Sequence, residues 1–437
     1  MNDKTATSGI YTLGCRVNQY ESQAIIEKLE ESGIEVRGFE EKNDIYLINT
    51  CTVTAESDRK SRQIIRRAAQ ISPESYVIVV GCMAESGFKE LMNLKGVDVI
   101  CGNGAKLKAV DAVIELLHKG VKNKRPIILA DSMLQRDSVF EPMSISNFSR
   151  TRAYVKIQDG CSGRCSYCII PSVRGASRSR PADDVYSEVK KLCENGCREV
   201  VLTGIETSDY QYGLLELTAK INEIPELERI RFGSLDPSFM KPDVVRQLSS
   251  INKVMPHFHL SIQSGSDRIL NLMRRRYSIQ AVKASAEAIR NNFSDAMITT
   301  DLITGFPGET DADTEMTANL IKELRLLHSH IFTYSKRSGT PAAEMKDQIP
   351  PQTKKQRAEY LESIQSDVKS EILEAHVGKD YKVLFETYKK GILYGHSENF
   401  IEMSAESEKD LSGQIAVIKA EKAKNGILSG KIKEFNV

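Results

Sequence analysis

Residues 154–168 read YVKIQDGCSGRCSYC, a short strand-like run followed by three closely spaced cysteines. Cys161, Cys165 and Cys168 have the spacing C-x3-C-x2-C. Three thiolates on one short loop can reach three irons of a 4Fe–4S cube. Because no fourth cysteine lies nearby, one iron would stay open, as it must if a small molecule is to chelate the cluster. A zinc site would need a fourth ligand close by, and three buried thiols are the other alternative.

The strand before this loop is the first of a series. In barrels of parallel strands, the loops at the C-terminal ends of the strands form the active site. Strand-like runs separated by helical patterns predict a partial (β/α)6 barrel over residues 145–375, closed by a long helical run at 354–378. The six predicted strands are residues 154–158, 199–204, 229–234, 257–262, 296–305 and 330–335.

The regions on either side predict two further domains. Strand-like and helical runs alternate over residues 1–130, which predicts an α/β domain with a parallel sheet. Short strand-like runs with glycine turns over residues 376–437 predict a small β-barrel. Residues 131–149 follow neither period and are expected to form a linker or a lid. The predicted fold class is therefore α/β, with a small β-barrel at the C-terminal end.

The composition is that of an ordinary globular protein, with 41% hydrophobic and 27% charged residues among 437. A formal net charge of +1 gives no overall attraction to nucleic acid or to a membrane, so a polyanion would have to bind local patches. Nothing reads as a membrane span or a signal peptide, which predicts a cytoplasmic protein without a membrane partner. Thiols stay reduced there, so the nine cysteines are expected to ligate metal or to be buried.

The cysteine motif, with the aromatic Tyr167 before its last cysteine, resembles the radical S-adenosylmethionine (SAM) superfamily. The resemblance implies the partial barrel and a 4Fe–4S cluster on Cys161, Cys165 and Cys168. It implies that SAM binds the open iron through its amino and carboxylate groups. One electron from the cluster would then cleave SAM into methionine and a 5′-deoxyadenosyl radical.

Residues at the ends of the later strands fit SAM binding at matching positions of that superfamily. Glycine allows close approach of the backbone, and a carboxylate can accept from the methionine ammonium or a ribose hydroxyl. These could be turn residues only, but their occurrence at successive strand ends favours a site. Together with Tyr167, the candidate SAM-binding residues are Thr203, Gly204, Glu206, Ser261, Gln263, Ser264, Thr300 and Asp301.

Three more cysteines, Cys15, Cys51 and Cys82, each follow an apolar strand-like run. In a parallel sheet such positions converge at the carboxyl edge of the strands, where ligands bind. Three convergent cysteines could ligate a second 4Fe–4S cluster with an open iron. Taken from the residues alone, buried core cysteines are the better interpretation, because free cysteine is commonly buried.

TLGCRVNQYES (12–22), INTCTVTAESDRKSRQIIRR (48–67) and GCMAE (81–85) are similar to the N-terminal domain of the methylthiotransferases. The resemblance covers all three domains, and the C-terminal barrel resembles a TRAM domain, an RNA-binding module. It implies that Cys15, Cys51 and Cys82 hold an auxiliary 4Fe–4S cluster. It also implies a transferase in which one SAM methylates sulfur held at that cluster and a second SAM yields the radical.

Within that family, NQYESQ, NTCTVT and KSRQIIRRA resemble the subtype that acts on threonylcarbamoyl-adenosine. The expected activity is tRNA modification, with a methylthio group added to carbon 2 of that nucleoside at position 37. The alternatives are the same chemistry on isopentenyl-adenosine or on a ribosomal protein aspartate, a radical SAM enzyme for a small molecule, and a redox or binding protein without turnover. The expected partners are tRNA, SAM and a flavodoxin-like or ferredoxin-like electron donor, and no catalytic residue beyond the cluster ligands is expected.

Basic runs give candidate RNA contacts, because guanidinium groups suit phosphates and stack on bases. A solvated face is the alternative for any single run. The triplet Arg274 to Arg276 adds a further basic patch. The candidate RNA-binding residues are Arg59, Arg62 and Arg66 on one helical face and Arg174, Arg178 and Arg180 directly after the cluster loop.

The remaining cysteines and histidines are expected to be structural. Cys101, Cys193 and Cys197 lie at ends of predicted elements and are interpreted as buried thiols. His257 and His259 alternate along one predicted strand and so share a face. A core or rim position is expected for His259, although it could reach the barrel lumen.

Overall fold

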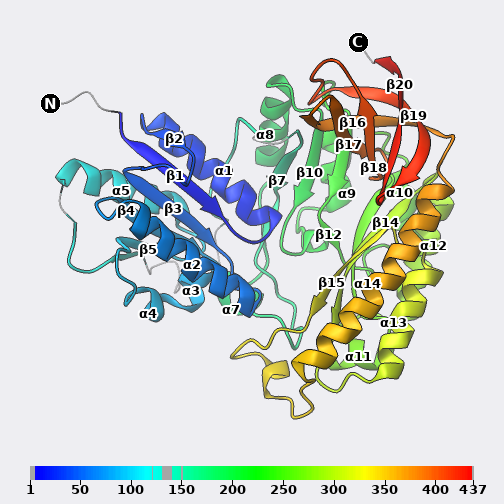
Figure 1. The fold of residues 1–437 in the computed structure, drawn as a ribbon, viewed down its shortest axis with the longest axis horizontal. Helices are drawn as coiled ribbons and strands as arrows, with labels where there is room; N and C mark the ends of the chain where they lie inside the picture. The colour runs from blue at the N-terminus through cyan, green and yellow to red at the C-terminus, as the bar shows by residue number, and fades with distance from the viewer. Residues whose placement is uncertain (1–4, 121, 130–139, 149–150, 436–437) are drawn as a thin grey trace.

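The computed structural model describes residues 5–120, 122–129, 140–148 and 151–435 (Figure 1). An N-terminal α/β unit lies beside a larger set of strands with helices on its outside, and a third group of strands near the C-terminus covers one end of the larger unit. Within the described ranges, no helix combines the length and the apolar character needed to cross a membrane.

The N-terminal unit is built on six strands that pair only in parallel, in the order β2-β1-β3-β4-β5-β6. Apolar strand residues form a separate core on each face of this sheet. The strands are β1 (Thr7–Thr12), β2 (Glu35–Arg37), β3 (Ile45–Thr50), β4 (Tyr76–Gly81), β5 (Val99–Cys101) and β6 (Ile127–Leu129). The helices are α1 (Arg16–Glu31), α2 (Ala55–Ile71), α3 (Cys82–Ser86), α4 (Phe88–Leu91) and α5 (Lys106–Lys119).

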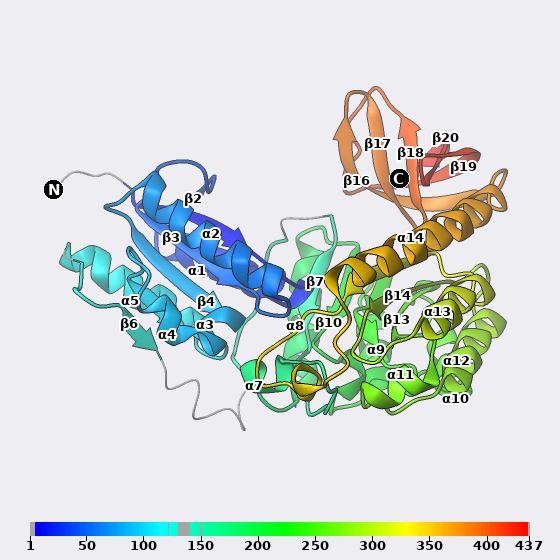
Figure 2. The ribbon, with the colours of Figure 1, turned by 60° about the horizontal axis from the view of Figure 1, so that its bottom comes forward.

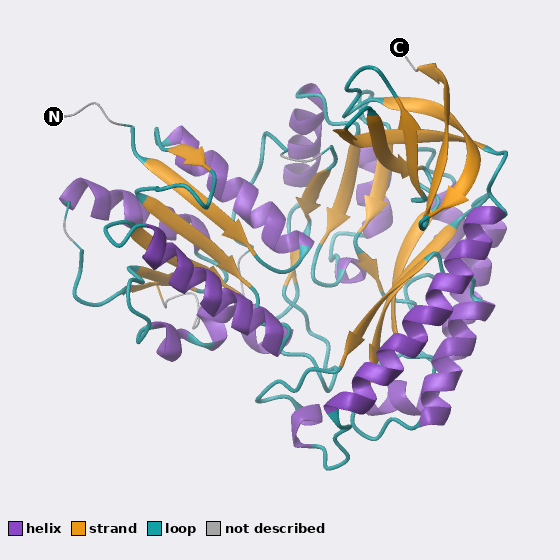
Figure 3. Ribbon diagram, in the orientation of Figure 1, coloured by secondary structure: helices purple, strands orange, loops and turns teal. Residues whose placement is uncertain are grey.

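The strand order of this sheet reverses between β1 and β3. At such a reversal the connecting helices leave on opposite faces, and ligands bind in the crevice at the carboxyl ends of the strands. In Figure 3 the strands of this sheet point toward the larger unit. Anything carried at their carboxyl ends therefore faces that unit.

The central unit is an open barrel of parallel strands in two hydrogen-bonded groups, β7-β10-β11 and β12-β13-β14-β15. All six predicted strands are present, but the run at 229–234 is divided at Gly233 into β11 and the additional short strand β12. The strands are β7 (Ala153–Lys156), β10 (Glu199–Thr203), β11 (Arg229–Phe232), β12 (Ser234–Leu235), β13 (His257–Gln263), β14 (Met297–Thr304) and β15 (His328–Thr333).

Helices cover the outside of this barrel (Figure 1). They are α8 (Ala182–Glu194), α9 (Leu214–Asn222), α10 (Pro242–Ser249), α11 (Asp267–Leu272), α12 (Ile279–Asn292) and α13 (Asp311–Glu323). Smaller elements are the hairpin β8 (Gln158–Asp159) and β9 (Arg178–Ser179), the helix α7 (Ile170–Arg174), and the short helices η1 (Thr207–Asp209) and η2 (Pro341–Glu344). Among the described residues β7 and β15 do not pair, so the barrel stays open on that side.

The long helix α14 (Pro351–Glu374) packs on α13 and β15 and leads into a five-stranded sheet that closes into a ring. The ring has the order β16-β17-β18-β20-β19 and lies beyond α14 in Figure 2. It occupies the region for which the sequence predicts a small barrel. The strands are β16 (Asp380–Lys389), β17 (Ile392–Ser397), β18 (Glu402–Glu406), β19 (Ile415–Lys424) and β20 (Ile427–Phe435).

The predicted linker or lid at 131–149 is described only in part, because residues 131–139 and 149 lie outside the described residues. The part at 140–148 packs between the two large units. Met143 and Ile145 are buried in the barrel core, and Tyr20 on α1 donates a hydrogen bond to the Met143 carbonyl at 2.9 Å. Residues 140–148 therefore join the N-terminal unit to the barrel.

Candidate active site between two cysteine triads

The barrel triad, Cys161, Cys165 and Cys168, lies on the loop between β8 and α7. The backbone fixes the loop at both ends. The Cys161 amide donates to the Gly175 carbonyl at 3.0 Å, and Ser166 donates through its amide and hydroxyl to carbonyls at the end of α11, at 3.0 and 2.7 Å. Gly160 has a φ of +70°, and a Cβ there would lie 2.0 Å from the Ala176 carbonyl oxygen. Only glycine fits that turn.

The three thiols of this triad are half-buried and influence one another. Burial, followed by the neighbouring Cys165 and Cys161, raises the pKa of Cys168 to about 12. Burial also raises the pKa of Cys161 to about 11. Unmetallated thiols at such positions stay protonated, whereas metal binding displaces the proton.

Arg275, one of the three arginines of the basic patch at 274–276, contacts this triad. Arg275 Nη1 donates to Cys165 Sγ at 3.2 Å, and its Nη2 lies 3.1 Å from Asp236 Oδ2. The guanidinium can stabilise a thiolate at Cys165 by a charge-assisted hydrogen bond. Its position within RRR at 274–276 gave no signal for this role, because the contact spans 110 positions of the chain.

Glu206 carries the clearest sign of an absent ligand. Its Oε1 is buried and has no hydrogen-bond partner within the described part of the chain. Burial, reinforced by the charge of Asp236, raises the pKa of Glu206 to about 7. Buried carboxylate oxygens are normally satisfied, so this one fits a cationic or hydroxyl-bearing ligand such as SAM. Gln158 Oε1 positions the residue by accepting from the amides of Ile205 and Glu206, both at 2.9 Å.

The other predicted SAM residues fall into three groups. Thr203, Gly204 and Asp301 line a common cavity. Thr300 and Ser264 are fully buried, and the Thr300 hydroxyl donates to the Leu260 carbonyl at 2.6 Å, so it links two strands. The remaining three are Ser261, whose carbonyl accepts from Arg275, Gln263, which has a φ of +68° at a bulge of β13, and Tyr167, whose ring packs edge-on against Phe306.

The second triad lies at the carboxyl edge of the N-terminal sheet, as predicted. Cys15 follows β1, Cys51 follows β3 and Cys82 follows β4. Asn18 ties the first two loops together, because its Nδ2 donates to the carbonyls of Leu13 and Thr50 at 2.7 and 3.0 Å. Burial, followed by the neighbouring thiols of Cys82 and Cys15, raises the pKa of Cys51 to about 11.

These two triads have the donor set of iron–sulfur clusters, since soft thiolates select them. In the described ranges, no three His, Cys, Asp or Glu side chains meet so as to hold a single metal ion. A cube differs from such a site because each thiolate binds a different iron, so the sulfurs surround a volume instead of meeting at one atom. Each triad supplies three thiolates, so one iron of a bound cube would have no ligand from the triad.

One cavity of about 310 Å³ lies between the N-terminal unit and the open side of the barrel. Cys15 lines it from the N-terminal unit, and Thr203 and Gly204 line it from the end of β10. The complete lining is Gly14, Cys15, Arg16, Val17, Gln19, Tyr154, Thr203, Gly204, Gly233, Ser234, His259, Asp301 and His330. A ligand in this cavity therefore contacts two sets of residues together. One is the Cys15 loop of the auxiliary triad (Cys15, Cys51 and Cys82), and the other is the predicted SAM-binding residues Thr203, Gly204 and Asp301.

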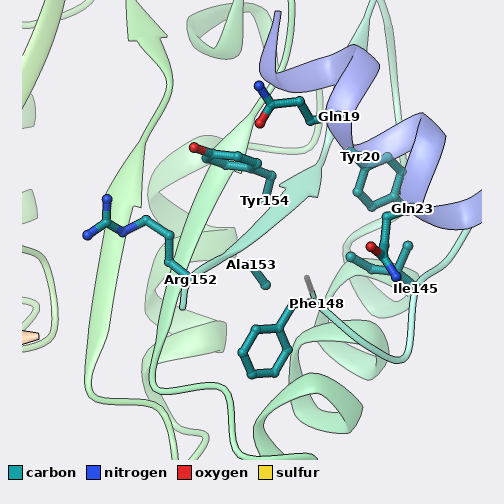
Figure 4. A pocket seen from close by; sticks show the side chains of 8 residues that line it. All are labelled: Gln19, Tyr20, Gln23, Ile145, Phe148, Arg152, Ala153 and Tyr154. Atoms are coloured by element: carbon teal, nitrogen blue, oxygen red, sulfur yellow. The ribbon is translucent and has the colours of Figure 1, made fainter. Parts of the chain in front are cut away.

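A smaller cavity of about 30 Å³ adjoins it between α1 and β7 (Figure 4). Gln19 on α1 and Tyr154 on β7 line both cavities. Its volume holds about one water molecule. Of these two adjoining cavities, the larger one has room for a substrate.

The predicted RNA-binding arginines separate into buried and exposed groups. Arg174 and Arg180 are buried, and Arg178 is nearly so, with hydrogen bonds to Asp159 and to backbone carbonyls. Contrary to the prediction, Arg174 and Arg180 are not on a surface that a nucleic acid can reach. The sequence missed this because their carboxylate partners, Glu21 and Glu188, are recognisable only in the folded chain. Arg59, Arg62 and Arg66 lie on α2, with Arg59 and Arg66 exposed.

The residues interpreted as structural divide similarly. Cys101, Cys193 and Cys197 are buried, as expected, and do not line the cavity. His259 instead lines the cavity, with Nε2 3.4 Å from Asp301 Oδ2 and Nδ1 2.9 Å from the Thr299 hydroxyl. His330 on β15 lines the same wall. The alternation along the predicted strand was the signal that could have found His259.

Two known families match this chain. Residues 155–321 match the radical SAM superfamily, and residues 7–102 match the uncharacterized protein family UPF0004. A solved structure of the radical SAM methyltransferase TsrM from Kitasatospora setae, with tryptophan and a SAM analogue, has a TM-score of 0.55 at 15% identity. It covers 77% of this chain and 75% of that chain, and the likeness concerns the fold alone.

Curated relatives match over nearly the full length. The threonylcarbamoyladenosine tRNA methylthiotransferase MtaB of Bacillus subtilis is 35% identical over 433 residues, covering 96% of this chain and 94% of the relative. The tRNA-2-methylthio-N(6)-dimethylallyladenosine synthase of Methylacidiphilum infernorum is 32% identical over 391 residues, covering 86% and 83%. Together with two cysteine triads at the ends of parallel strands, these matches show that the chain belongs to the radical SAM methylthiotransferase family.

Proposed function

We propose that this chain modifies tRNA by adding a methylthio group to carbon 2 of threonylcarbamoyl-adenosine at position 37. The observation that carries the proposal is the cavity between the N-terminal unit and the barrel, with Cys15 on one wall and Thr203 and Gly204 on the other. Replacing hydrogen on an unactivated aromatic carbon needs a sulfur donor and a hydrogen-abstracting centre at one atom. The cavity joins one thiol of the N-terminal triad to the predicted SAM-binding residues of the barrel, which supports both approaches to a single base.

The proposed cofactors are two 4Fe–4S clusters and SAM. Cys161, Cys165 and Cys168 would hold one cluster, and Cys15, Cys51 and Cys82 the auxiliary one. When bound and reduced, the barrel cluster supplies the electron for reductive cleavage of SAM. A flavodoxin-like or ferredoxin-like protein is the proposed source of that electron.

The protein's own residues bind and orient the reactants. Glu206 would accept from the SAM ammonium, which satisfies its free buried oxygen. Gln158 holds the backbone on which Glu206 stands. Arg275 donates to Cys165 Sγ and so orients one of the three proposed cluster ligands. Packing of the N-terminal unit against the barrel would limit the access of water to a reactive radical.

For tRNA itself we propose two contact surfaces. The first is the face of α2 with Arg59, Arg62 and Arg66; this helix begins four positions after Cys51 and so adjoins the auxiliary triad. The second is the C-terminal ring of strands, by its likeness to an RNA-binding TRAM domain. A tRNA substrate would place the protein's activity in the cytoplasm.

The choice of threonylcarbamoyl-adenosine is supported by the activity for which the Bacillus subtilis relative is named and by the charged lining of the cavity. The second candidate substrate is isopentenyl-adenosine at the same position, the same chemistry as the dimethylallyladenosine relative. A ribosomal protein aspartate is a third. All three use the same cofactors and differ only in what the cavity must accommodate.

Mass spectrometry of tRNA nucleosides from a strain lacking the gene tests the proposal. We expect 2-methylthio-threonylcarbamoyl-adenosine to disappear and to return with the wild-type chain, but not with Cys51→Ala or Cys165→Ala. Arg198→Ala, at a surface ion pair with Glu228, is the matched control that should restore it. Unchanged levels in a strain without a redundant enzyme would refute the substrate, and loss of the isopentenyl product instead would establish the second candidate.

A further inference from the structure

The cavity between the N-terminal unit and the barrel is lined by a cation, Arg16, for which the described residues offer no ion pair. Arg16 directly follows Cys15, lines the cavity and is half-buried, with its guanidinium carbon 5.9 Å from the ring centre of Tyr154. Within the described part of the chain it forms no ion pair. The other cations along this side of α1 are paired: Lys106, Lys156 and Arg174 all contact Glu21.

The opposite wall of the cavity is polar and carries a negative charge. Although burial opposes it, the hydrogen bond from His259 and the charges of His259, His330 and Arg16 hold the pKa of Asp301 below its usual range. Asp301 is therefore ionised at neutral pH. A second anion in the cavity is repelled from the Asp301 wall and attracted to Arg16, which sets the direction in which an anionic ligand enters.

We propose that Arg16 binds the carboxylate of the threonylcarbamoyl group and is the residue that selects this substrate. The inference rests on the proposed function and goes beyond it, because it assigns the choice of nucleoside to one side chain. Threonylcarbamoyl-adenosine carries one carboxylate next to its ureido group. A guanidinium suits it because its planar fork matches carboxylate geometry.

The same arrangement disfavours an isopentenyl group. An alkyl chain in the cavity would displace water from Arg16 and offer it no partner, whereas Asp301 is already paired with His259. Sites built to bind a polar group reject analogues that lack it, because their own polar groups are then left unpaired. The cavity thus combines attraction to one nucleoside with a penalty against the other.

Binding of synthetic anticodon stem-loop RNAs to the cluster-loaded full-length protein tests this assignment. The first RNA carries threonylcarbamoyl-adenosine at position 37, the second carries the same group with its carboxylate converted to the methyl amide, and the third carries isopentenyl-adenosine. We expect the wild type to bind the acid about 10- to 100-fold more tightly than the amide, the effect of one charged hydrogen-bonded pair. Arg16→Gln should bring that ratio close to one and leave affinity for the amide unchanged, whereas Arg16→Lys should keep part of it.

The controls separate this inference from the proposed function. Arg198→Gln removes a paired surface charge and should keep the wild-type ratio. Equal loss of affinity for acid and amide in Arg16→Gln would overturn the assignment. If Arg16→Gln fails to take up iron, the acid-to-amide affinity ratios of the wild type and of Arg16→Lys test the assignment instead. A wild-type ratio near one would refute the role of Arg16. Wild-type turnover of the isopentenyl RNA without turnover of the acid would instead refute the proposed function.

Discussion

Arg174 Nη1 lies 3.0 Å from Glu21 Oε1, a contact that joins the end of α7 in the barrel unit to the first helix of the N-terminal unit. The same guanidinium donates to Asn18 Oδ1 at 2.7 Å and to Asp159 Oδ1 at 2.9 Å. Asn18 ties the loops of the auxiliary triad, and Asp159 stands two positions before Cys161. One buried side chain therefore connects the supports of both triads, which fixes their separation.

Replacing Arg174 tests this connection. Arg174→Met removes a cation from a fully buried group of charges and leaves Glu21 and Asp159 with one partner fewer each. Breaking a buried pair costs about 3–5 kcal/mol, so we expect the free energy of unfolding in urea to fall by about 3 kcal/mol or more. Arg174→Lys keeps the positive charge but loses the two-pronged guanidinium group. Its free energy of unfolding should therefore lie between those of the wild type and Arg174→Met.

A surface pair provides the comparison for that measurement. Arg198 lies 2.7 Å from Glu228, with both side chains well exposed. Exposed pairs contribute about 1 kcal/mol or less, so Arg198→Met should leave the unfolding transition nearly unchanged. An Arg174→Met protein as stable as Arg198→Met would show that the buried contact does not hold the units together.

The sequence predicts those parts of the site that depend on local pattern. Cys15, Cys51 and Cys82 each follow an apolar run, and parallel strands bring their carboxyl ends to one edge. The cluster loop at Cys161 to Cys168 is contiguous in sequence, so its spacing alone indicates its chemistry. The spacing of the cluster loop was enough to find the barrel triad, whereas the ligand role of the N-terminal triad rests on the resemblance to the methylthiotransferases.

Roles that depend on distant partners could not be predicted. Arg174 and Glu21 are 153 positions apart, and an arginine-rich run reads as a surface whether it is exposed or buried. Arg275 was hidden in a basic triplet for the same reason, although it contacts Cys165. Charge in a sequence does not tell where its counter-charge lies.

The junction between the barrel and the C-terminal ring is expected to weaken in acid. Glu199 is fully buried beside Arg231, Arg152 and Arg229, and Arg231 also donates to two carbonyls of the ring. Burial opposes ionisation, but Arg231 and its neighbours lower the pKa of Glu199 to about 2. A carboxyl whose folded pKa is depressed adds stability above its unfolded pKa and loses it as the pH falls through the folded value.

We therefore expect the free energy of unfolding to fall on the order of 3 kcal/mol between pH 4.5 and 2 because of this group. Urea unfolding at a series of pH values measures it. Glu199→Gln should be less stable at pH 7 and should show a smaller decrease across that window. Identical pH profiles for the two proteins would mean that Glu199 does not supply the dependence.

SAM binding is expected to depend on pH near neutrality through Glu206. Its pKa of about 7, raised by burial, means that the carboxyl is neutral below pH 7 and ionised above it. Only the carboxylate attracts an ammonium group, so affinity for SAM should fall up to tenfold for each pH unit below 7. Titration calorimetry of SAM into the cluster-loaded protein from pH 5.5 to 8 measures this, and Glu206→Gln should bind weakly with a flatter profile. A profile equally steep in Glu206→Gln would assign the titration to another group.

Single cysteine substitutions should separate the two triads by iron content and chemistry. Because each triad lies in its own folded unit, loss of one ligand in either should remove about half of the iron and leave the other half in place. Cys165→Ala should lose reductive cleavage of SAM with its share of iron, whereas Cys51→Ala should keep SAM cleavage but form no methylthio product. Iron analysis, together with high-performance liquid chromatography of 5′-deoxyadenosine after reduction with dithionite, measures both outcomes.

Cys193→Ala, at a buried thiol outside the cavity lining, is the matched control and should keep all of the iron. Full iron content in Cys51→Ala would mean that the N-terminal triad does not hold a cluster, and the sulfur-carrying role proposed for it would have to be abandoned.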